Sequence, residues 1–350
     1  MSKTERLLQL IQDLSQLNGP SGQESSVRDY IIAQIKNYAS YRVDALGNII
    51  AEKKGDARPS VKIMLDAHMD EVGVIVTTIR PDGLLQFETV GGIGVDALFG
   101  KRIAFDKTKG VIGGLPLHLL SSDQKQRYPS LSNLYIDIGC TTQEQAQQLV
   151  SVGDMGVFDS QFTLFGDGFM KAKALDDRVG CAILIDMIQS DLPYDMTFTF
   201  TVREEVGLVG AKTAAFQVQP QVALVLETTT AADVAGSTEL NRVCALKNGV
   251  VVSFMDRATL YHKDLYDFSF KIAKRNGIAI QSKNAVAGGN NAGAIHGIGG
   301  GIPTLALSLP CRYLHSPSCV IHEFDLLATA KMTKYLSIAL ASGEKFAETL

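Results

Sequence analysis

Residues 176–227 contain the four segments that decide the fold. In chain order they read DDRVGCAILIDMI (176–188), MTFTFTV (196–202), GLVGAKTAAF (207–216) and VALVLE (222–227). The first and third have the length and composition of helices, whereas the second and fourth are short and apolar, as in strands buried on both faces. Helices that alternate with such strands predict an α/β sheet covered by helices on both faces.

The same alternation extends in both directions from this stretch. Toward the C-terminus the sequence predicts two strands and two helices, at 251–255, 304–310, 260–275 and 324–340. Near the N-terminus two amphipathic helices precede a hairpin and the apolar strand VKIMLDA (61–67). Both ends of the chain are therefore expected to contribute to one sheet.

Residues 71–168 have a different pattern. They form short apolar segments separated by glycine-rich turns, with one helical segment, TTQEQAQQLV (141–150). A single hydrophobic core stops growing at roughly 250–300 residues, so a chain of 350 residues is expected to hold more than one. The simplest organisation is an α/β domain built from residues 1–70 and 169–350, interrupted by a β-rich insert at 71–168.

Composition excludes several classes of partner. The chain carries 33 basic and 37 acidic residues, a formal net charge of −4, with no basic run to match nucleic acid or an anionic membrane. Its five cysteines are scattered and never form a CxxC pair, which argues against a disulfide framework. The first residues carry charges, among them Lys3 and Arg6, where a signal peptide would need its apolar stretch, and no run of about 18 apolar residues occurs in the sequence. We expect a cytoplasmic protein that binds neither nucleic acid nor membrane.

Reactive side chains follow the expected strands, at the sheet edge where open α/β sheets bind ligands. Strand 61–67 leads into His68 and Asp70, and strand 196–202 leads into Glu204 and Glu205. The other candidates are Glu227 at the end of its strand, His315 in the loop LPCRYLHSP (309–317) and Asp176 at the start of a helix. Two histidines with several carboxylates suit a divalent cation such as Zn²⁺, Co²⁺ or Mn²⁺.

Taken alone, each candidate also fits an ordinary structural role. His68 and Asp70 fit a surface ion pair as well as a metal ligand whose second ring nitrogen is held by a carboxylate. Glu204 and Glu205 fit exposed charges, because neighbours on a regular strand point to opposite faces. Both serve one site only if the strand end is irregular. Asp176 fits a favourable acid at a helix N-terminus. Their joint occurrence at strand ends favours the metal site.

Six segments, spread in order over nearly the whole chain, carry a family resemblance. They are GPSGQE (19–24), AHMDEVG (67–73), KALDDRVG (173–180), REEVGLVGA (203–211), GGNNAGAIH (288–296) and PCRYLHSP (310–317). Together they resemble the tetrahedral, glutamyl and deblocking aminopeptidases of metallopeptidase family forty-two. The resemblance implies a mixed central sheet flanked by helices, as in zinc-peptidase catalytic domains. It also implies that the insert is a small β-barrel-like dimerisation domain.

The resemblance further implies a dinuclear site and a role for each candidate. One cation would be held by His68 and Glu227 and the other by Glu205 and His315, with Asp176 bridging them. Glu204 would be the general base, and Asp70 would support His68. Zn²⁺ is the favoured cation, with Co²⁺ and Mn²⁺ as alternatives. Two positions depart from the family pattern, since many members carry Asp in place of Glu227 and of Asn291.

The resemblance implies peptide substrates and a homo-oligomer, in which dimers assemble into tetrahedra of twelve chains around an inner chamber. Other activities fit the same residues: a related dinuclear amidohydrolase, such as a carboxypeptidase or deacylase, an endoglucanase-type glycosidase, or a non-catalytic homologue. An aminopeptidase needs a free substrate amine, and a glycosidase with two carboxylates needs no metal. The sequence does not indicate which N-terminal residue is preferred.

Overall fold

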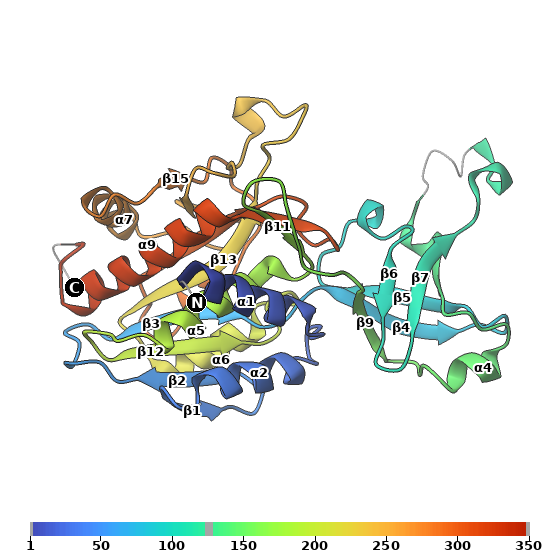
Figure 1. The fold of residues 1–350 in the computed structure, drawn as a ribbon, viewed down its shortest axis with the longest axis horizontal. Coiled ribbons are helices and arrows are strands. Elements are labelled where there is room, and N and C mark those ends of the chain that lie inside the picture. Colours follow the sequence, from blue (N-terminus) through green and yellow to red (C-terminus); the bar gives the residue numbers. More distant parts are fainter. Residues whose placement is uncertain (1–2, 123–128, 348–350) are drawn as a thin grey trace.

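The computed structural model describes residues 3–122 and 129–347. Its largest element is an eight-stranded mixed sheet flanked by helices (Figure 1), which confirms the fold class expected from the alternating segments. Across the sheet the strands lie in the order β1 (Ser40–Val43), β2 (Ile49–Lys53), β12 (Met196–Thr201), β3 (Ile63–His68), β13 (Val222–Thr230), β16 (Thr304–Cys311), β14 (Val250–Val252) and β15 (Ile280–Ser282).

The four central strands, β12, β3, β13 and β16, run parallel to one another. Almost all of their residues are buried, which explains their continuous apolar sequence. Parallel strands bring their carboxyl ends to one edge, so His68 at the end of β3 pairs with Thr201 at the end of β12. Strand β13 is longer than expected, because residues 228–230 continue to pair with β16. Glu227 therefore lies within this strand and not at its end.

Seven of the α-helices in the described ranges accompany this sheet: α1 (Lys3–Gln16), α2 (Ser25–Ile35), α5 (Leu175–Ile188), α6 (Val209–Val218), α7 (Lys263–Arg275), α8 (Ala292–Ile295) and α9 (Glu323–Ala341). Every residue of α5 is buried, because this helix packs on β3 and β13 and is covered by α1 and α2. None of the helices within the described residues has the length and apolarity to cross a membrane.

The insert forms a closed six-stranded barrel beside the main sheet (Figure 1). Its strands follow one another around the barrel as β4 (Gly73–Ile79), β5 (Leu85–Val90), β8 (Leu134–Asp137), β7 (Lys109–Gly114), β6 (Arg102–Ala104) and β9 (Met155–Phe158). Alternate residues of β5 and β7 face a separate apolar core that includes Val74, Ile112 and Ile136. The expected helix at 141–150 is present as the shorter α4 (Gln143–Gln147), capped by Thr142.

A separate three-stranded sheet was not expected from the sequence. It consists of β10 (Thr163–Phe165), β11 (Phe169–Ala172) and β17 (Cys319–His322). All three residues of β10 are exposed, so this strand has no apolar alternation that would reveal it. Strand β17 follows the loop that carries His315, and its pairing with β11 ties that loop to the segment that precedes α5.

Candidate metal centre

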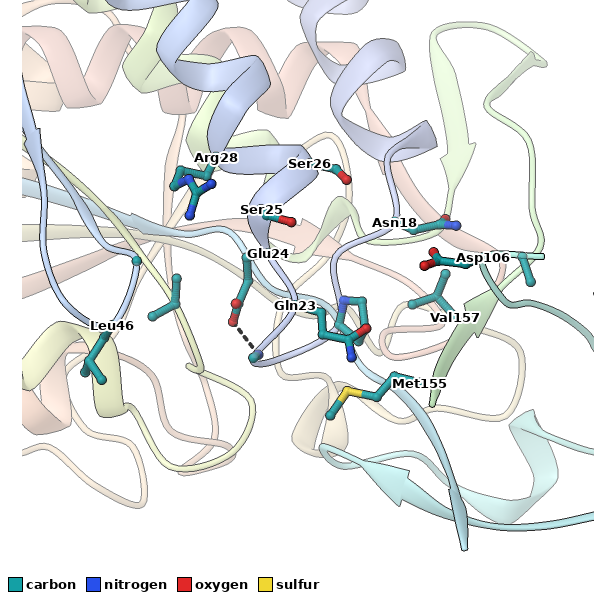
Figure 2. A pocket seen from close by; sticks show the side chains of 15 residues that line it. Asn18, Gln23, Glu24, Ser25, Ser26, Arg28, Leu46, Asp106, Met155 and Val157 are labelled. Atoms are coloured by element: carbon teal, nitrogen blue, oxygen red, sulfur yellow. Dashed lines mark hydrogen bonds between the residues drawn. The ribbon is translucent and has the colours of Figure 1, made fainter. Parts of the chain in front are cut away.

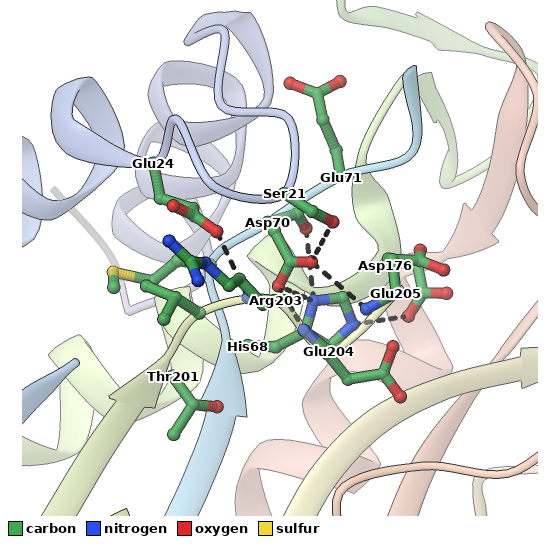
Figure 3. Close-up of polar contacts among 12 residues, drawn as sticks. Ser21, Glu24, His68, Asp70, Glu71, Asp176, Thr201, Arg203, Glu204 and Glu205 are labelled. Atoms are coloured by element: carbon green, nitrogen blue, oxygen red, sulfur yellow. Dashed lines mark hydrogen bonds and ion pairs between the residues drawn. The ribbon is translucent and has the colours of Figure 1, made fainter. Parts of the chain in front are cut away.

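His68 is the last residue of β3 and is 1% exposed. Its Nδ1 atom lies 3.1 Å from the main-chain oxygen of Asp70 and 3.4 Å from Asp70 Oδ1. Both neighbours are acceptors and favour a proton on Nδ1, so Nε2 is the ring nitrogen that would bind a cation. Figure 3 shows the ring held against Asp70, with the acidic side chains of Glu204, Glu205 and Asp176 nearby.

The carboxylate of Asp70 connects three segments of the chain. It accepts hydrogen bonds from Ser21 Oγ at 2.6 Å and from the main-chain N–H groups of Glu204 at 3.0 Å and Glu205 at 3.1 Å. Burial disfavours its charge, but its contacts with His68 and these donors outweigh that cost and keep the pKa of Asp70 below the usual value. Asp70 is thus an ionised anchor for both the histidine and the glutamate pair.

Glu204 and Glu205 follow β12 at an irregular turn, which is the arrangement that a shared site requires. Arg203 adopts a left-handed conformation with φ of 57°, so the chain leaves the strand before the two glutamates. The Arg203 N–H donates to the Glu24 carboxylate at 3.1 Å, which fixes this turn. One ligand atom each from His68, Glu204 and Glu205 lies within 4.8 Å of the others.

Asp176 lies between the two histidines. Its Oδ1 is 3.5 Å from His68 Nε2, and its Oδ2 is 3.3 Å from His315 Nε2. Although α5 begins at Leu175, the backbone of Asp176 is extended, with φ of −83° and ψ of 109°, and this turns its side chain into the site. Asp176 therefore does more than place a favourable negative charge at the N-terminus of a helix, because its carboxylate lies between two imidazole rings.

His315 completes the second half of the cluster. Its Nε2 lies 3.2 Å from Glu205 Oε1, and its Nδ1 lies 2.6 Å from the main-chain oxygen of Gly92, a residue of the insert. Burial opposes the charge of this imidazole, but its hydrogen bonds with Asp176 and Glu205 raise its pKa to about 11. Without a cation this histidine therefore holds a proton at neutral pH.

The insert lies so close to the site that Gly91, the residue before Gly92, has no room for a side chain. A Cβ atom at Gly91 would lie 2.9 Å from Val72 Cγ1 and 3.2 Å from Glu205 Cβ, and the φ of this residue is +83°. No pattern in the sequence indicates that Gly91 or Gly92 lies here. The β-rich insert and the α/β sheet both shape the site.

Glu227 faces His68 from β13. Its Oε2 lies 3.9 Å from His68 Nε2, and the residue is 6% exposed. Burial raises the pKa of this carboxyl well above the usual value. The structure thus brings together all seven residues singled out in the sequence: His68, Asp70, Asp176, Glu204, Glu205, Glu227 and His315.

The cluster has the properties of a cation site. Three of its buried atoms, His68 Nε2, Asp176 Oδ1 and Glu227 Oε1, have no hydrogen-bond partner. An unpaired buried polar atom is costly, and a buried carboxylate even more so, unless a cation is bound. Three groups of ligand atoms have the required spacing, and two of them contain Asp176: His68, Asp176 and Glu227 form one, and Asp176, Glu205 and His315 form the other. Asp176 belongs to both groups, so these residues fit two adjacent divalent cations.

Asn291, which departs from the family pattern, does not face the cluster. It is fully buried, and its Nδ2 donates to Asp66 Oδ2 at 2.8 Å and to Thr201 Oγ1 at 2.9 Å. Burial raises the pKa of Asp66 to about 6, against the hydrogen bonds from Thr199 and Asn291 that lower it. An amide at position 291 thus serves as a donor to a buried acid, and Asn291 is not among the residues that line the cavity at the cluster.

Two cavities of the structure are lined by different kinds of side chain. The cavity at the cluster has a volume of about 190 Å³ and is lined by Asp176, Glu204, Glu205, Glu227 and His315, among others. A larger cavity of about 460 Å³ lies between the 18–28 segment and the barrel (Figure 2). Its Glu24 carboxylate is already engaged by the Gly22 N–H, and no histidine lines it. The smaller cavity is the one lined by carboxylates and a histidine that could hold a cation.

Comparisons with known proteins agree with this geometry. The model of the M42 glutamyl aminopeptidase family matches residues 47–332. Lysyl aminopeptidase of Pyrococcus furiosus is 30% identical over 340 residues, which cover 94% of this chain and 96% of the relative. A TET aminopeptidase from a marine sediment archaeon of the Thaumarchaeota has a TM-score of 0.91 at 32% identity, over 98% of both chains.

A further solved structure shares the fold. The TET1 peptidase of Pyrococcus horikoshii has a TM-score of 0.83 at 36% identity, over 96% of this chain and 99% of its own. That protein is described as able to assemble into a tetrahedron or a large octahedral shell. The family match, which covers most of the sequence, confirms the resemblance carried by the six segments. This chain belongs to the M42 glutamyl aminopeptidase family.

Proposed function

We propose that this chain removes N-terminal residues from peptides at a site that holds two divalent cations. The observation that supports this most strongly is the position of Asp176, with one oxygen 3.5 Å from His68 and the other 3.3 Å from His315. His68 and Glu227 would hold one cation, and His315 and Glu205 the other. Asp176 would bridge them.

Two such cations supply Lewis-acid chemistry, which polarises the scissile carbonyl and anchors the free amine of the substrate. Glu204 is the residue left for proton transfer, because its carboxylate is not needed in either group of ligands that contains Asp176. Without cations, burial raises the pKa of Glu204 well above the usual value. A general base works best when its pKa lies near the working pH. We assign Glu204 to take the proton of the attacking water and deliver it to the leaving nitrogen.

Asp70 has a supporting role in this proposal. It holds the His68 ring through Nδ1 and fixes the main chain of Glu204 and Glu205. A carboxylate behind a ligating histidine sets its tautomer and raises its basicity. Zn²⁺ is the favoured cation for two histidines and three carboxylates, and Co²⁺ or Mn²⁺ fits the same donors.

The activity is tested with aminoacyl-p-nitroanilides. After chelation, the protein is assayed with added Zn²⁺, Co²⁺ or Mn²⁺ against free and N-acetylated substrates. We expect metal-dependent cleavage of the free substrates only. Cleavage of an N-acetylated peptide with a free C-terminal carboxylate would support the carboxypeptidase or deacylase alternative, and hydrolysis of a β-glucan that persists in EDTA would support the glycosidase. Absence of turnover with two bound metals would indicate a non-catalytic homologue.

We also propose how the chain is organised and where it acts. Residues 1–70 and 169–350 would form the catalytic domain, and residues 71–168 would form a domain for dimerisation and assembly. The protein would act in the cytoplasm. The TET1 peptidase of P. horikoshii supports an assembly of this kind. Twelve chains of 37.7 kDa would weigh about 450 kDa, a mass that light scattering separates from a dimer. A monomer mass would contradict the assembly but leave the catalytic site intact.

A further inference from the structure

The insert contacts the loop that carries His315 at two points, and the proposed catalytic roles use neither of them. This loop, residues 312–318, connects β16 to β17. The main-chain oxygen of Gly92 lies 2.6 Å from His315 Nδ1, and Ser160 Oγ donates a hydrogen bond to the main-chain oxygen of Pro317 at 2.5 Å. Gly92 follows β5 and Ser160 follows β9, so two separate strands of the barrel lead to this loop.

The contact with Gly92 orients the imidazole ring of His315. A carbonyl oxygen can only accept a hydrogen bond, so it favours a proton on Nδ1 and leaves Nε2 as the nitrogen that would bind a cation. This Nε2 lies 3.2 Å from Oε1 of Glu205, the ligand proposed for the same cation. Asp70 holds His68 through the corresponding ring nitrogen. The Gly92 carbonyl therefore stands behind His315 as Asp70 stands behind His68.

The loop itself has an uncommon backbone conformation. Tyr313 and His315 have φ of 57° and 55°, in the left-handed region that residues other than glycine adopt only where their surroundings hold them. Ser160 supplies one such restraint from the insert. It is 8% exposed, and its Oγ accepts a hydrogen bond from Lys171 Nζ at 2.7 Å, which leaves the hydroxyl proton for the Pro317 oxygen.

The main chain before Gly92 fits tightly against the α/β fold. Gly91 has a φ of +83°, and a Cβ atom there would lie 2.9 Å from Val72 Cγ1 and 3.2 Å from Glu205 Cβ. A side chain at this position would push the segment away from the site, and the Gly92 oxygen with it. Gly100, also in the insert, has a φ of +74°, but no atom of the described residues lies within 4 Å of its Cβ position.

A buried ion pair fixes the insert where it joins the α/β fold. Glu71 is the first residue of the insert, and Lys173 lies just beyond its end. Lys173 Nζ donates to both Glu71 oxygens, at 2.6 and 2.9 Å, and both side chains are at most 3% exposed. Arg178 is fully buried and donates to Glu71 Oε1 at 3.4 Å and to the Met69 oxygen at 2.8 Å. A buried polar network of this kind is rigid, so the insert keeps one orientation relative to the site.

We infer that the insert positions one half of the metal centre: the Gly92 carbonyl orients the His315 ring, and Ser160 holds the loop that carries it. This role rests on the proposed function, because it requires a cation at His315 and Glu205. It gives the insert a task within each chain that is separate from assembly. Loss of either contact should weaken the cation at His315 and leave the other cation unchanged.

Zinc binding to the metal-free protein, in competition with a chromophoric chelator, tests this role. The wild type should show two binding steps, and His315→Ala identifies the step that belongs to this histidine. In Gly91→Ala that step should weaken about 10- to 100-fold, and in Ser160→Ala about 3- to 10-fold, since one hydrogen bond is lost. Gly100→Ala matches the first variant in backbone conformation, and the exposed Ser151→Ala matches the second. Both controls should keep both steps.

A second comparison separates positioning of His315 from a general effect on the fold. In the His315→Ala background, Ser160→Ala should cause no further loss of zinc affinity, because the ring that it positions is gone. An equal loss in both backgrounds would overturn the inference. It would also be overturned if Gly91→Ala and Ser160→Ala kept both wild-type steps, or weakened the two steps alike. If Gly91→Ala does not fold, Ser160→Ala decides the question, because it adds no clash.

The outcomes distinguish this role from the proposed function. A wild type that binds fewer than two zinc ions would refute the two-cation site and this role together. A wild type that binds two ions but cleaves none of the anilides would refute the aminopeptidase proposal alone, because zinc binding still reports on His315. A wild type that binds two ions and cleaves, with zinc steps insensitive to Gly91→Ala and Ser160→Ala, would refute this role alone.

Discussion

Asp70 Oδ1 accepts the main-chain N–H of Glu204 at 3.0 Å, which links the strand that carries His68, a proposed metal ligand, to the residue proposed as general base. The two residues lie 134 positions apart in the sequence. Because the same carboxylate also contacts His68 Nδ1, one ionised side chain sets the position of a ligand and of the base together. Metal affinity and proton transfer are therefore expected to be coupled through Asp70.

Replacement of Asp70 tests this coupling. Asp70→Asn keeps the size of the side chain but removes its charge and turns one oxygen into a donor that faces the main-chain N–H groups of Glu204 and Glu205. We expect zinc affinity and kcat each to fall roughly 10- to 100-fold. Dialysis against zinc buffers and steady-state kinetics measure the two effects, with the exposed Asp82→Asn as control. Unchanged values for both would contradict the supporting role.

Some parts of the site could be predicted from the sequence, and others could not. His68 and the pair of Glu204 and Glu205 were found because apolar strands lead directly into them. The left-handed turn at Arg203 and the contact of Gly92 with His315 depend on partners up to 223 residues away, which no local pattern contains.

Removal of the cations should lower stability. Without them, the carboxylates of Asp176, Glu205 and Glu227 remain buried close to one another, which is unfavourable. A cation at 100 times its Kd adds about 2.7 kcal/mol to the free energy of unfolding. We expect EDTA to lower Tm by about 5 °C or more and Zn²⁺ to restore it. In His315→Ala the zinc-dependent shift should shrink, and equal shifts in both proteins would place the cation elsewhere.

Cation binding should release protons. The pKa of His315 is raised to about 11 by Asp176 and Glu205 despite its burial, so a cation at neutral pH must displace its proton. Lowering the pH therefore weakens binding, by up to tenfold per pH unit for each proton displaced. Calorimetry with Zn²⁺ in two buffers of different ionisation enthalpy should show release of at least one proton per chain. Identical heats in the two buffers would refute the assignment of His315 as a ligand.

Replacement of Asn291 by aspartate, which places a second acid beside Asp66, should lower the stability of the protein. In Asn291→Asp a carboxylate would replace the amide that donates to Asp66 at 2.8 Å, inside the core. The pKa of Asp66 is already raised to about 6 by burial and would rise further, so stability should be kept at low pH and lost as pH increases through this value. We expect a loss of roughly 1–3 kcal/mol at pH 8. Thermal unfolding at pH 5 and pH 8 checks this, with the exposed Asn133→Asp as reference.

The most direct test of the catalytic assignment is Glu204→Gln, measured for metal content and turnover in the same preparation. Glutamine preserves the size of the side chain but cannot accept the water proton. The proposed roles require about two zinc ions per chain by elemental analysis, as in the wild type and in the exposed control Glu52→Gln. They also require that kcat fall by roughly 10² to 10⁴. Near-normal turnover in a Glu204→Gln variant that holds both ions would contradict the central claim.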